Sequence, residues 1–292
     1  MSMPTATAES AQRKRAYSSP VLAALRVAGL MAASLFLLVC WAVLRKITRD
    51  IKTQNRKAAH WTSRWTRWCL AITGFRVTTS GPQPAEGSLV APNHIGYADV
   101  LALGSVVPCF FVAKVDVESW PFVGLLFRIS KNIGVPRRRA RALVEVTNEV
   151  AERLRGGNSV CVFLEGTSTG GDRLLPFYPP LAQPAIDAQA QTVPVAIRWH
   201  ADAPDIDVAE DVAYWKDHVF GPHAWRLMGL RRISVHIQFG DPIPAEGHNR
   251  KTLAAAAESA VAAMTGLPVL GPEARPESLT GKADRDTESV PG

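Results

Sequence analysis

The sequence predicts an α/β domain with a mostly parallel, mixed sheet flanked by helices, preceded by two N-terminal helices that contact a membrane. Two observations lead to this prediction. Between about residues 75 and 264, short apolar runs alternate with segments of helical periodicity, which is typical of strands and helices in turn. Ahead of them lies a long uncharged stretch. The composition, 47% hydrophobic and 20% charged, excludes a disordered or fibrous chain.

The N-terminal part contains the uncharged stretch. Residues 1–19 are small and polar, so we expect them to be disordered. Residues 27–44 carry no charge, and as a helix rising 1.5 Å per residue they extend about 27 Å, close to the roughly 30 Å of a hydrocarbon core. A signal peptide is disfavoured because no small-residue cleavage site follows. A buried core helix is the remaining alternative to a membrane helix.

The next segment predicts a second, amphipathic helix, which completes a membrane unit over residues 20–74. Trp61, Trp65 and Trp68 recur at helical spacing, and Arg64 and Arg67 lie between them. Tryptophan favours the headgroup level of a bilayer, and arginine reaches lipid phosphates from there. We therefore expect an interfacial helix. The alternative is an ordinary helix whose tryptophans enter the protein core.

The basic residues suggest an orientation and a class of partner. Four Lys or Arg residues lie within 15 residues before the apolar run, and six lie within 15 residues after it. This bias predicts that most of the chain lies on the cytoplasmic face of the inner or plasma membrane, although basic residues on both sides also suit insertion into one leaflet. The net charge of +7 favours an anionic partner.

The globular domain is expected over residues 75–266, followed by a disordered tail at 267–292 that is rich in Pro, Glu, Asp, Ser and Thr. The strands of the globular domain are expected at 75–80, 87–92, 109–113, 133–136, 159–164, 192–198 and 233–239. Its helices are expected at 98–106, 121–131, 139–155, 180–189 and 249–265.

The first chemical motif is the segment NHIGYAD, which follows an apolar strand and contains His94 and Asp99. Ligands of α/β folds bind at the carboxyl ends of strands. A carboxylate five residues after the histidine can accept a hydrogen bond from the imidazole, fix its tautomer and stabilise the imidazolium. His94 is therefore a candidate general base. An equally weighted alternative is that Asp99 only caps the helix.

The second motif is a buried strand that ends in Glu165, followed by Gly166 and Thr167 in a glycine-rich loop. Such a loop exposes main-chain N–H groups to an anion, and a carboxylate beside it can bind a substrate hydroxyl. The alternative is a turn that binds nothing.

The third motif is a basic run that follows a strand and contains Arg137, Arg138, Arg139 and Arg141. Arginine matches phosphate oxygens in a bidentate geometry. Most such runs are only solvated, so Arg137, the first after the strand, is the best candidate for a binding residue.

These motifs, in this order, resemble the glycerolipid acyltransferase family, the 1-acylglycerol-3-phosphate acyltransferases and their relatives, over about residues 81–243. The resemblance implies that His94 is the base and that Asp99 orients it. It also implies that Arg137, Glu165 and Gly166 bind the acceptor, with Thr167 beside them, and more weakly that Lys114 lies near its phosphate. Two departures are Leu164, where the family usually has proline, and Val135-Pro136 before Arg137.

The resemblance implies acyl transfer from acyl-CoA or acyl-carrier protein to the free hydroxyl of a lysolipid, with no metal and no cofactor beyond this co-substrate. We expect 1-acyl-sn-glycerol 3-phosphate as acceptor, giving phosphatidic acid. The segment between Tyr214 and Ile243 is similar to lyso-ornithine lipid O-acyltransferases, which keeps that acceptor as an alternative.

A non-catalytic lipid-binding protein is the alternative from another class, and the presence of both His94 and Asp99 favours the enzyme. Membrane lipids are expected partners. Nucleic acid is not, because the basic residues cluster near the membrane helix. The four cysteines form no CxxC pair, which disfavours a zinc site or a disulfide scaffold.

Overall fold

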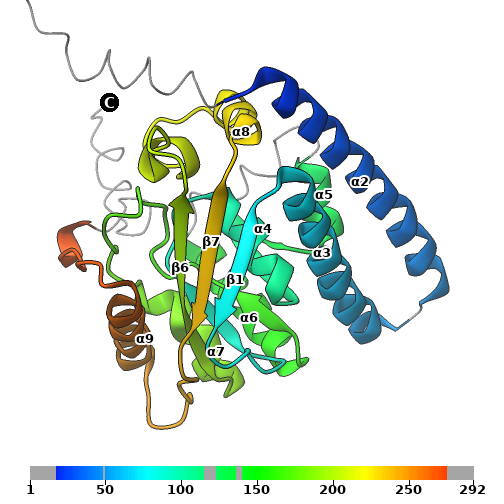
Figure 1. Cartoon of the computed structure of the whole chain (residues 1–292). Coiled ribbons are helices and arrows are strands. Elements are labelled where there is room, and N and C mark those ends of the chain that lie inside the picture. Colours follow the sequence, from blue (N-terminus) through cyan, green and yellow to red (C-terminus); the bar gives the residue numbers. More distant parts are fainter. Residues whose placement is uncertain (1–17, 49, 115–122, 136–139, 275–292) are drawn as a thin grey trace, which may run out of the picture.

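The computed structural model describes residues 18–48, 50–114, 123–135 and 140–274. The elements alternate between strands and helices along most of the chain (Figure 1). The helices are α2 (Pro20–Ile47), α3 (Ile51–Thr73), α4 (Tyr97–Val106), α5 (Val123–Ile129), α6 (Ala140–Arg155), η2 (Pro179–Ala182), α7 (Gln183–Ala188), η3 (Val208–Val212), α8 (Phe220–Gly229), α9 (Arg250–Thr265) and η4 (Pro272–Ala274).

Within the described residues, the strands form one sheet of seven, in the order β1-β7-β6-β2-β5-β3-β4. Neighbouring strands are parallel except β6 and β7, which are antiparallel, so the predicted fold class is confirmed. Each strand overlaps one expected segment. Their bounds are β1 (Arg76–Ser80), β2 (Leu89–Pro92), β3 (Cys109–Lys114), β4 (Ile133–Val135), β5 (Ser159–Cys161), β6 (Thr192–Ala201) and β7 (Ile233–Phe239).

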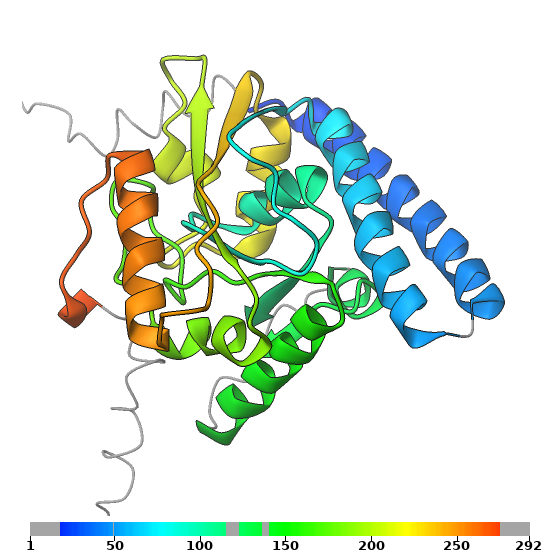
Figure 2. The same ribbon diagram turned by 90° about the horizontal axis from the view of Figure 1, so that it is seen from below.

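Both faces of the sheet are buried. Because side chains alternate along a strand, Leu89 and Ala91 of β2 enter one hydrophobic cluster while Val90 enters the other. Helices α6, α7 and α9 cover the face of Leu89, and α4 and α8 cover the face of Val90. Figure 2 shows these helices on opposite sides of the sheet. The central strands are therefore held rigidly at the point where the chemical motifs leave the sheet.

Helices α2 and α3 lie side by side along one flank of the domain in both views (Figures 1 and 2). Asp50 caps the start of α3 by accepting a hydrogen bond from the Thr53 N–H at 2.7 Å. Ala23 of α2 and Leu70 of α3 belong to the same buried cluster as the sheet. The predicted division at residue 75 therefore marks no break in the packing.

The outward face of α2 is apolar. Residues 20–43 form a helix that is long and apolar enough to cross a membrane, and only 17% of its most apolar 18-residue stretch is buried.

The tryptophans of α3 do not all face away from the protein, as a purely interfacial helix would require. Trp65 donates a hydrogen bond to the Ser34 hydroxyl of α2 at 2.9 Å, and the Trp68 ring lies 5.8 Å from that of Phe36. These two side chains contact the neighbouring helix.

Two parts of the chain differ from the sequence expectations. The segment from Val208 to Gly229, with η3 and α8, was not predicted to be helical. Residues 267–274, assigned to the disordered tail, contact the domain, where Val269 forms a β-bridge with Leu174. At the other end, the Ser19 N–H donates to the Gly229 carbonyl at 3.1 Å. The rest of both predicted disordered ends lies outside the described residues.

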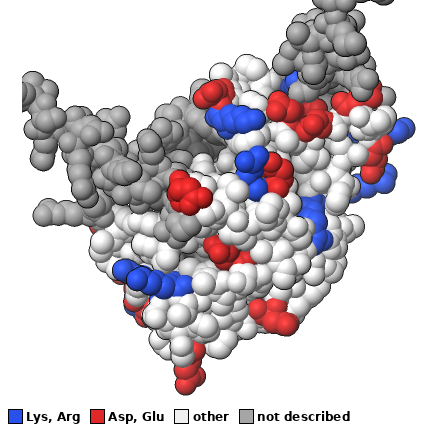
Figure 3. All heavy atoms as spheres, turned by 90° about the vertical axis from the view of Figure 1, so that its left-hand side faces the viewer, with Lys and Arg blue, Asp and Glu red and all other residues white. Residues whose placement is uncertain are grey.

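Figure 3 shows charges of both signs interspersed over the face that lies at the left of Figure 1. Where this face is described, the positive charge does not gather into the continuous basic surface that binds nucleic acid.

Candidate active site

The loop that carries His94 begins where β2 ends and leads into α4. Asn93, which is buried, holds it to β6: its side-chain amide donates to the Ile197 carbonyl at 3.1 Å and accepts from the Ile197 N–H at 2.7 Å. These two side-chain hydrogen bonds continue the link between β2 and β6 beyond Pro92, where the regular main-chain pairing of the two strands ends. The position of His94 at the carboxyl end of a central strand is thereby fixed.

His94 and Asp99 form a hydrogen-bonded pair. Nδ1 of His94 lies 2.9 Å from Oδ2 of Asp99, which is fully buried. The same oxygen accepts the N–H groups of Ile95 at 2.7 Å and Gly96 at 3.0 Å, and Oδ1 accepts the indole N–H of Trp199 at 2.7 Å. Four donors thus compensate the burial of one carboxylate.

This arrangement leaves Nε2 of His94 available. Because the carboxylate accepts from Nδ1, the neutral imidazole carries its proton there and has a lone pair on Nε2. No residue that the structure describes is hydrogen-bonded to Nε2. The ring stacks on Phe163, with centroids 3.8 Å apart and planes 24° apart, and 20% of the His94 side chain is exposed. The site can therefore accept a proton from a bound hydroxyl group.

The second motif meets the first at the main chain of His94. Oε1 of Glu165 accepts the His94 N–H at 2.7 Å, and Oε2 accepts the Leu175 N–H at 2.7 Å. The Thr169 N–H in turn donates to the His94 carbonyl at 2.9 Å. Strands β2 and β5 are parallel neighbours, so the loops that follow them lie at the same edge of the sheet.

Glu165 is fully buried, and burial raises its pKa to about 8. The N–H groups of Leu175 and His94 oppose this rise, and the nearby carboxyls of Asp99 and Glu258 add to it. Both carboxyl oxygens are engaged by the main chain. The structure therefore places Glu165 beneath the His94 loop, as a support, and not in an open position facing an acceptor.

Gly166 and Thr167 follow Glu165 on the partly exposed side of the same loop. Gly166 has a φ of +72°, a left-handed conformation that glycine adopts without strain, and its N–H donates to the Phe163 carbonyl at 3.0 Å. Ser168 donates a hydrogen bond to the Tyr214 carbonyl at 2.6 Å. The loop is thus closed on one side by His94 and on the other by the segment before α8.

The two predicted basic binding residues are described less completely. Lys114 is the last residue of β3 and pairs with Val135 of β4, so its main chain lies at the same edge of the sheet as His94. Nothing is described of its side chain. Arg137 lies outside the described residues. The binding roles of both stay predictions.

Three residues around the site were not predicted from the sequence. Phe163 stacks on His94, Trp199 bonds to Asp99, and the Tyr214 N–H donates to the Ile95 carbonyl at 2.7 Å. Phe163 lies within the second motif and could have been found there. Trp199 lies 100 residues from Asp99, and Tyr214 lies still farther from Ile95, so no local pattern signals them.

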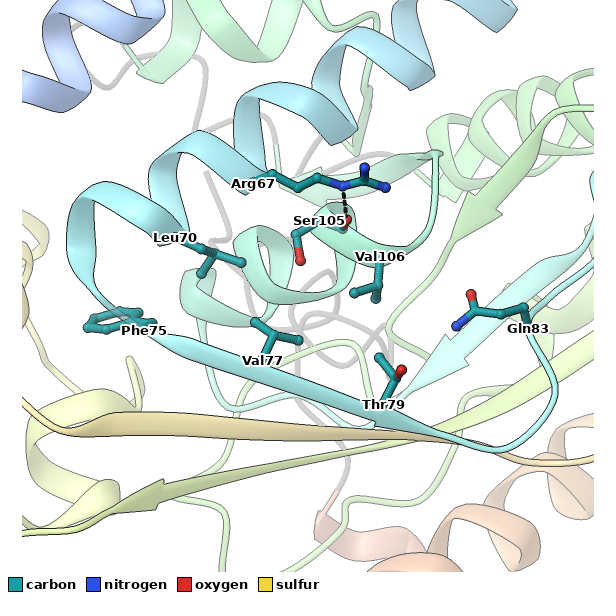
Figure 4. Close-up of a pocket in the computed structure, with 8 residues that line it drawn as sticks. All are labelled: Arg67, Leu70, Phe75, Val77, Thr79, Gln83, Ser105 and Val106. Carbon is teal, nitrogen blue, oxygen red and sulfur yellow. Dashed lines mark hydrogen bonds between the residues drawn. The ribbon is translucent and has the colours of Figure 1, made fainter.

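Within the described ranges, no group of three or more His, Cys, Asp and Glu residues could hold a metal ion. The described part of the structure also contains a separate open cavity of about 460 Å³ (Figure 4). It lies at the far end of α4, where Arg67 donates to the Ser105 carbonyl at 2.7 Å. It contains none of the predicted site residues. The lining residues are Arg67, Leu70, Phe75, Val77, Thr79, Gln83, Ser105 and Val106.

Known proteins resemble this chain in both sequence and fold. A family model described as Acyltransferase matches residues 74–198. A lyso-ornithine lipid O-acyltransferase from Pseudomonas aeruginosa is 31% identical over 82% of this chain and 91% of its own, and one from Brucella abortus is 31% identical over 85% and 95%.

A 1-acyl-sn-glycerol-3-phosphate acyltransferase from Neisseria meningitidis is 30% identical over 57% of this chain and 64% of its own. The crystal structure of the acyltransferase PlsC from Thermotoga maritima has the same fold, with a TM-score of 0.64, 18% identity, and coverage of 84% of this chain and 94% of that one. These relatives are enzymes, which decides against the non-catalytic alternative. The chain belongs to the acyltransferase family, and it transfers an acyl group to a lysolipid.

Proposed function

We propose that this enzyme acylates the free hydroxyl of a lyso-ornithine lipid by general base catalysis from His94. Nε2 of His94 takes the hydroxyl proton while the hydroxyl oxygen attacks the carbonyl carbon of an acyl thioester. A tetrahedral intermediate forms, the carbon–sulfur bond breaks, and the thiolate takes the proton back from His94. An ester and a free thiol result, and no protein nucleophile, metal or further cofactor takes part.

The pair of His94 and Asp99 is the observation that carries this mechanism. Asp99 holds the imidazole in the tautomer with a free Nε2, and its negative charge stabilises the imidazolium that forms during attack. The partial exposure of the ring admits a substrate, while the stacking on Phe163 limits its rotation. The acyl donor is a thioester of coenzyme A or of acyl-carrier protein, since both present the same reacting carbonyl.

The proposed acceptor is supported by the segment Val208–Gly229, which packs against the site loops through Tyr214. This segment lies beyond the part matched by the family model, which ends at residue 198. A match that covers 82% of the 292-residue chain must include it, because more than 60 residues follow Gly229. The long match to lyso-ornithine lipid acyltransferases therefore extends to the segment beside the site, which supports this acceptor.

The second candidate acceptor is 1-acyl-sn-glycerol 3-phosphate, which the sequence motifs favoured. The Neisseria relative supports it, although that match covers 57% of the chain and need not include α8. The sequence-predicted basic residues Arg137 and Lys114 suit a phosphate monoester, and they also suit the carboxylate of an ornithine lipid.

Membrane attachment is part of the proposal. The exposed apolar face of α2 supports insertion into an apolar environment, and the excess of basic residues after the apolar run favours a domain on the cytoplasmic face. The lysolipid would then reach His94 from the bilayer in which it is dissolved.

The acceptor is tested with purified enzyme in detergent and a radiolabelled long-chain acyl thioester, offered first as acyl-CoA and then as acyl-carrier protein. Lyso-ornithine lipid and 1-acyl-sn-glycerol 3-phosphate are compared at equal concentration, with His94→Ala as the inactive control. We expect kcat/KM to be at least tenfold higher for the lyso-ornithine lipid. A preference for the glycerophosphate would replace the proposed acceptor by the second candidate and leave the chemistry unchanged.

A further inference from the structure

Trp199 lies in the middle of the fold and contacts the reactive pair from a distant part of the sequence. It is a buried residue of β6, and its indole N–H donates to Oδ1 of Asp99 at 2.7 Å. The ring is braced by an edge-to-face contact with Phe75, with centroids 6.0 Å apart. The family model ends at residue 198, one residue before Trp199. Neither the motifs nor the family match therefore gives this residue a role.

The two oxygens of Asp99 have different surroundings. Oδ2 accepts from His94 and from two main-chain N–H groups, whereas Oδ1 has the Trp199 indole as its one donor among the described residues. A carboxylate that rotates about its Cβ–Cγ bond exchanges the two oxygens. Without the indole N–H, Oδ1 would be a buried acceptor with no donor, and such an acceptor favours either rotation or protonation of the group.

We propose that Trp199 is a positioning residue for acyl transfer, which holds Oδ2 of Asp99 on Nδ1 of His94 and keeps Asp99 ionised. The proposal rests on the general base role of His94. Trp199 is buried, and in this role it acts through Asp99.

The proposal makes a prediction about pH. Removing a donor from an anionic acceptor makes the pair of His94 and Asp99 bind a proton more tightly, wherever that proton settles. Catalysis needs the unprotonated pair, so its acid limb moves to higher pH. Two other titratable groups face Asp99, namely Glu165 from the loop after β5 and Cys161 from β5 itself. Burial keeps the pKa of Cys161 well above its usual value.

The substitution Trp199→Phe tests the role, because it keeps an aromatic ring beside Phe75 and removes the N–H together with part of the indole, a loss of ring volume that the control variant shares. We expect kcat to fall roughly ten- to a hundredfold with little change in the KM of the lysolipid, as for the loss of one hydrogen bond to a charged group. The acid limb of the pH profile of kcat/KM should move to higher pH.

The matched control is Trp215→Phe. Trp215 also donates one indole hydrogen bond, to the Ala209 carbonyl at 2.8 Å, but it makes no bond to Asp99. This variant should keep the acid limb of the unaltered enzyme. Equal shifts in both variants, or none in Trp199→Phe, would overturn the proposal.

A spectroscopic measurement keeps the test independent of activity. In the full chain with 15N-labelled tryptophan, the indole N–H resonance that Trp199→Phe removes should shift when Asp99→Asn neutralises its acceptor. The resonance that Trp215→Phe removes should stay in place. An unshifted Trp199 resonance would overturn the contact itself. If His94→Ala retained turnover while this resonance shifted, the general base mechanism would fail and the contact would stand.

Discussion

The reactivity of His94 depends on how its main chain and its ring are held. Glu165 and Thr169 bind its N–H and carbonyl, Asp99 binds Nδ1, and Phe163 covers one face of the ring. Each contact removes a rotation that would take Nε2 away from a bound hydroxyl. Pre-organisation of this kind lowers the barrier because no reorientation is needed when the substrate reacts.

Gly96 is the residue at which this loop tolerates least change. A Cβ atom there would lie 2.7 Å from the Tyr214 nitrogen and 2.9 Å from its Cβ, and the φ of +157° disfavours other residues. We expect Gly96→Ala to lower the free energy of unfolding by about 1–3 kcal/mol and to reduce turnover, because Asp99 accepts the Gly96 N–H. Chemical denaturation and a transfer assay measure the two effects.

Gly221 provides the control for this prediction. A Cβ at this position in α8 meets nothing within 4 Å. Gly221→Ala should leave stability unchanged or raise it by up to about 1 kcal/mol. Similar losses in both alanine variants would show that the contact with Tyr214 does not constrain the loop.

Glu165 makes stability depend on pH. Its pKa rises from 4.5 to about 8 on folding, mainly through burial, so between these values the folded chain keeps a proton that the unfolded chain releases. The stability from this group is complete below about pH 4.5 and is lost as the pH rises through about 8. We expect that, as the pH rises from 5 to 8, the melting temperature of Glu165→Gln falls less than that of the unaltered chain. Thermal unfolding at several pH values measures this difference. Parallel pH dependences would contradict the raised pKa.

The residue scale also shows where prediction from sequence stops. The pairing of His94 with Asp99 could be predicted, because the two residues are five positions apart in one loop. The loop that contains Gly166 could also be recognised from its glycine-rich sequence. The role of Glu165 as a support could not, because its partners His94 and Leu175 are brought together only by the packing of β2 on β5. The indole of Trp199 reaches Asp99 across 100 residues of sequence.

At the scale of elements, α2 packs against the domain on one side and exposes apolar side chains on the other. One side packs against α3 and α8, where Arg26 donates to the Met228 carbonyl at 2.9 Å. The other side exposes large apolar side chains, among them Leu35 at 62% and Val39 at 57%. A face of this kind is costly in water and favourable in a bilayer.

Charges on that face test the membrane attachment. We expect the double variant Leu35→Arg and Val39→Arg to leave the membrane fraction in flotation experiments, because arginine at the centre of a membrane helix costs about 2.5–3.5 kcal/mol. Val144→Arg, at an exposed position of α6, is the control and should float with the unaltered protein. A double variant that stays fully with the membrane would contradict the assignment.

The strands were easier to predict than some helices. Apolar runs mark most of the described strands, although β1 is largely polar, whereas α8 contains Gly221 and Pro222 near its start, two residues that disfavour a helix. The tryptophans of α3 show a regular spacing, but spacing alone does not distinguish a membrane from a neighbouring helix. The indole N–H of Trp65 donates a hydrogen bond to the Ser34 hydroxyl of α2.

At the scale of the whole molecule, the topology creates the site. The first motif follows β2 and the second follows β5, and these strands are parallel neighbours at the centre of the sheet. Their loops meet at His94, and the segment before α8 closes over both through Tyr214. Helices α2 and α3 lie at one flank (Figure 1), and the proposed insertion of α2 into a bilayer would bring the domain to its substrates. The fold thus holds the proposed base, His94, at the edge of the sheet where the two loops meet.

The most direct test of this account is the rate of acyl transfer by purified His94→Ala, with labelled thioester and lysolipid at saturating concentrations. His200→Ala is the matched control, because His200 is an exposed residue of β6 outside the site. We predict that His94→Ala loses about 10²–10⁴ in turnover while its thermal unfolding stays close to that of the unaltered chain, and that His200→Ala keeps full turnover. Turnover by folded His94→Ala within a few-fold of the unaltered enzyme would contradict the central claim.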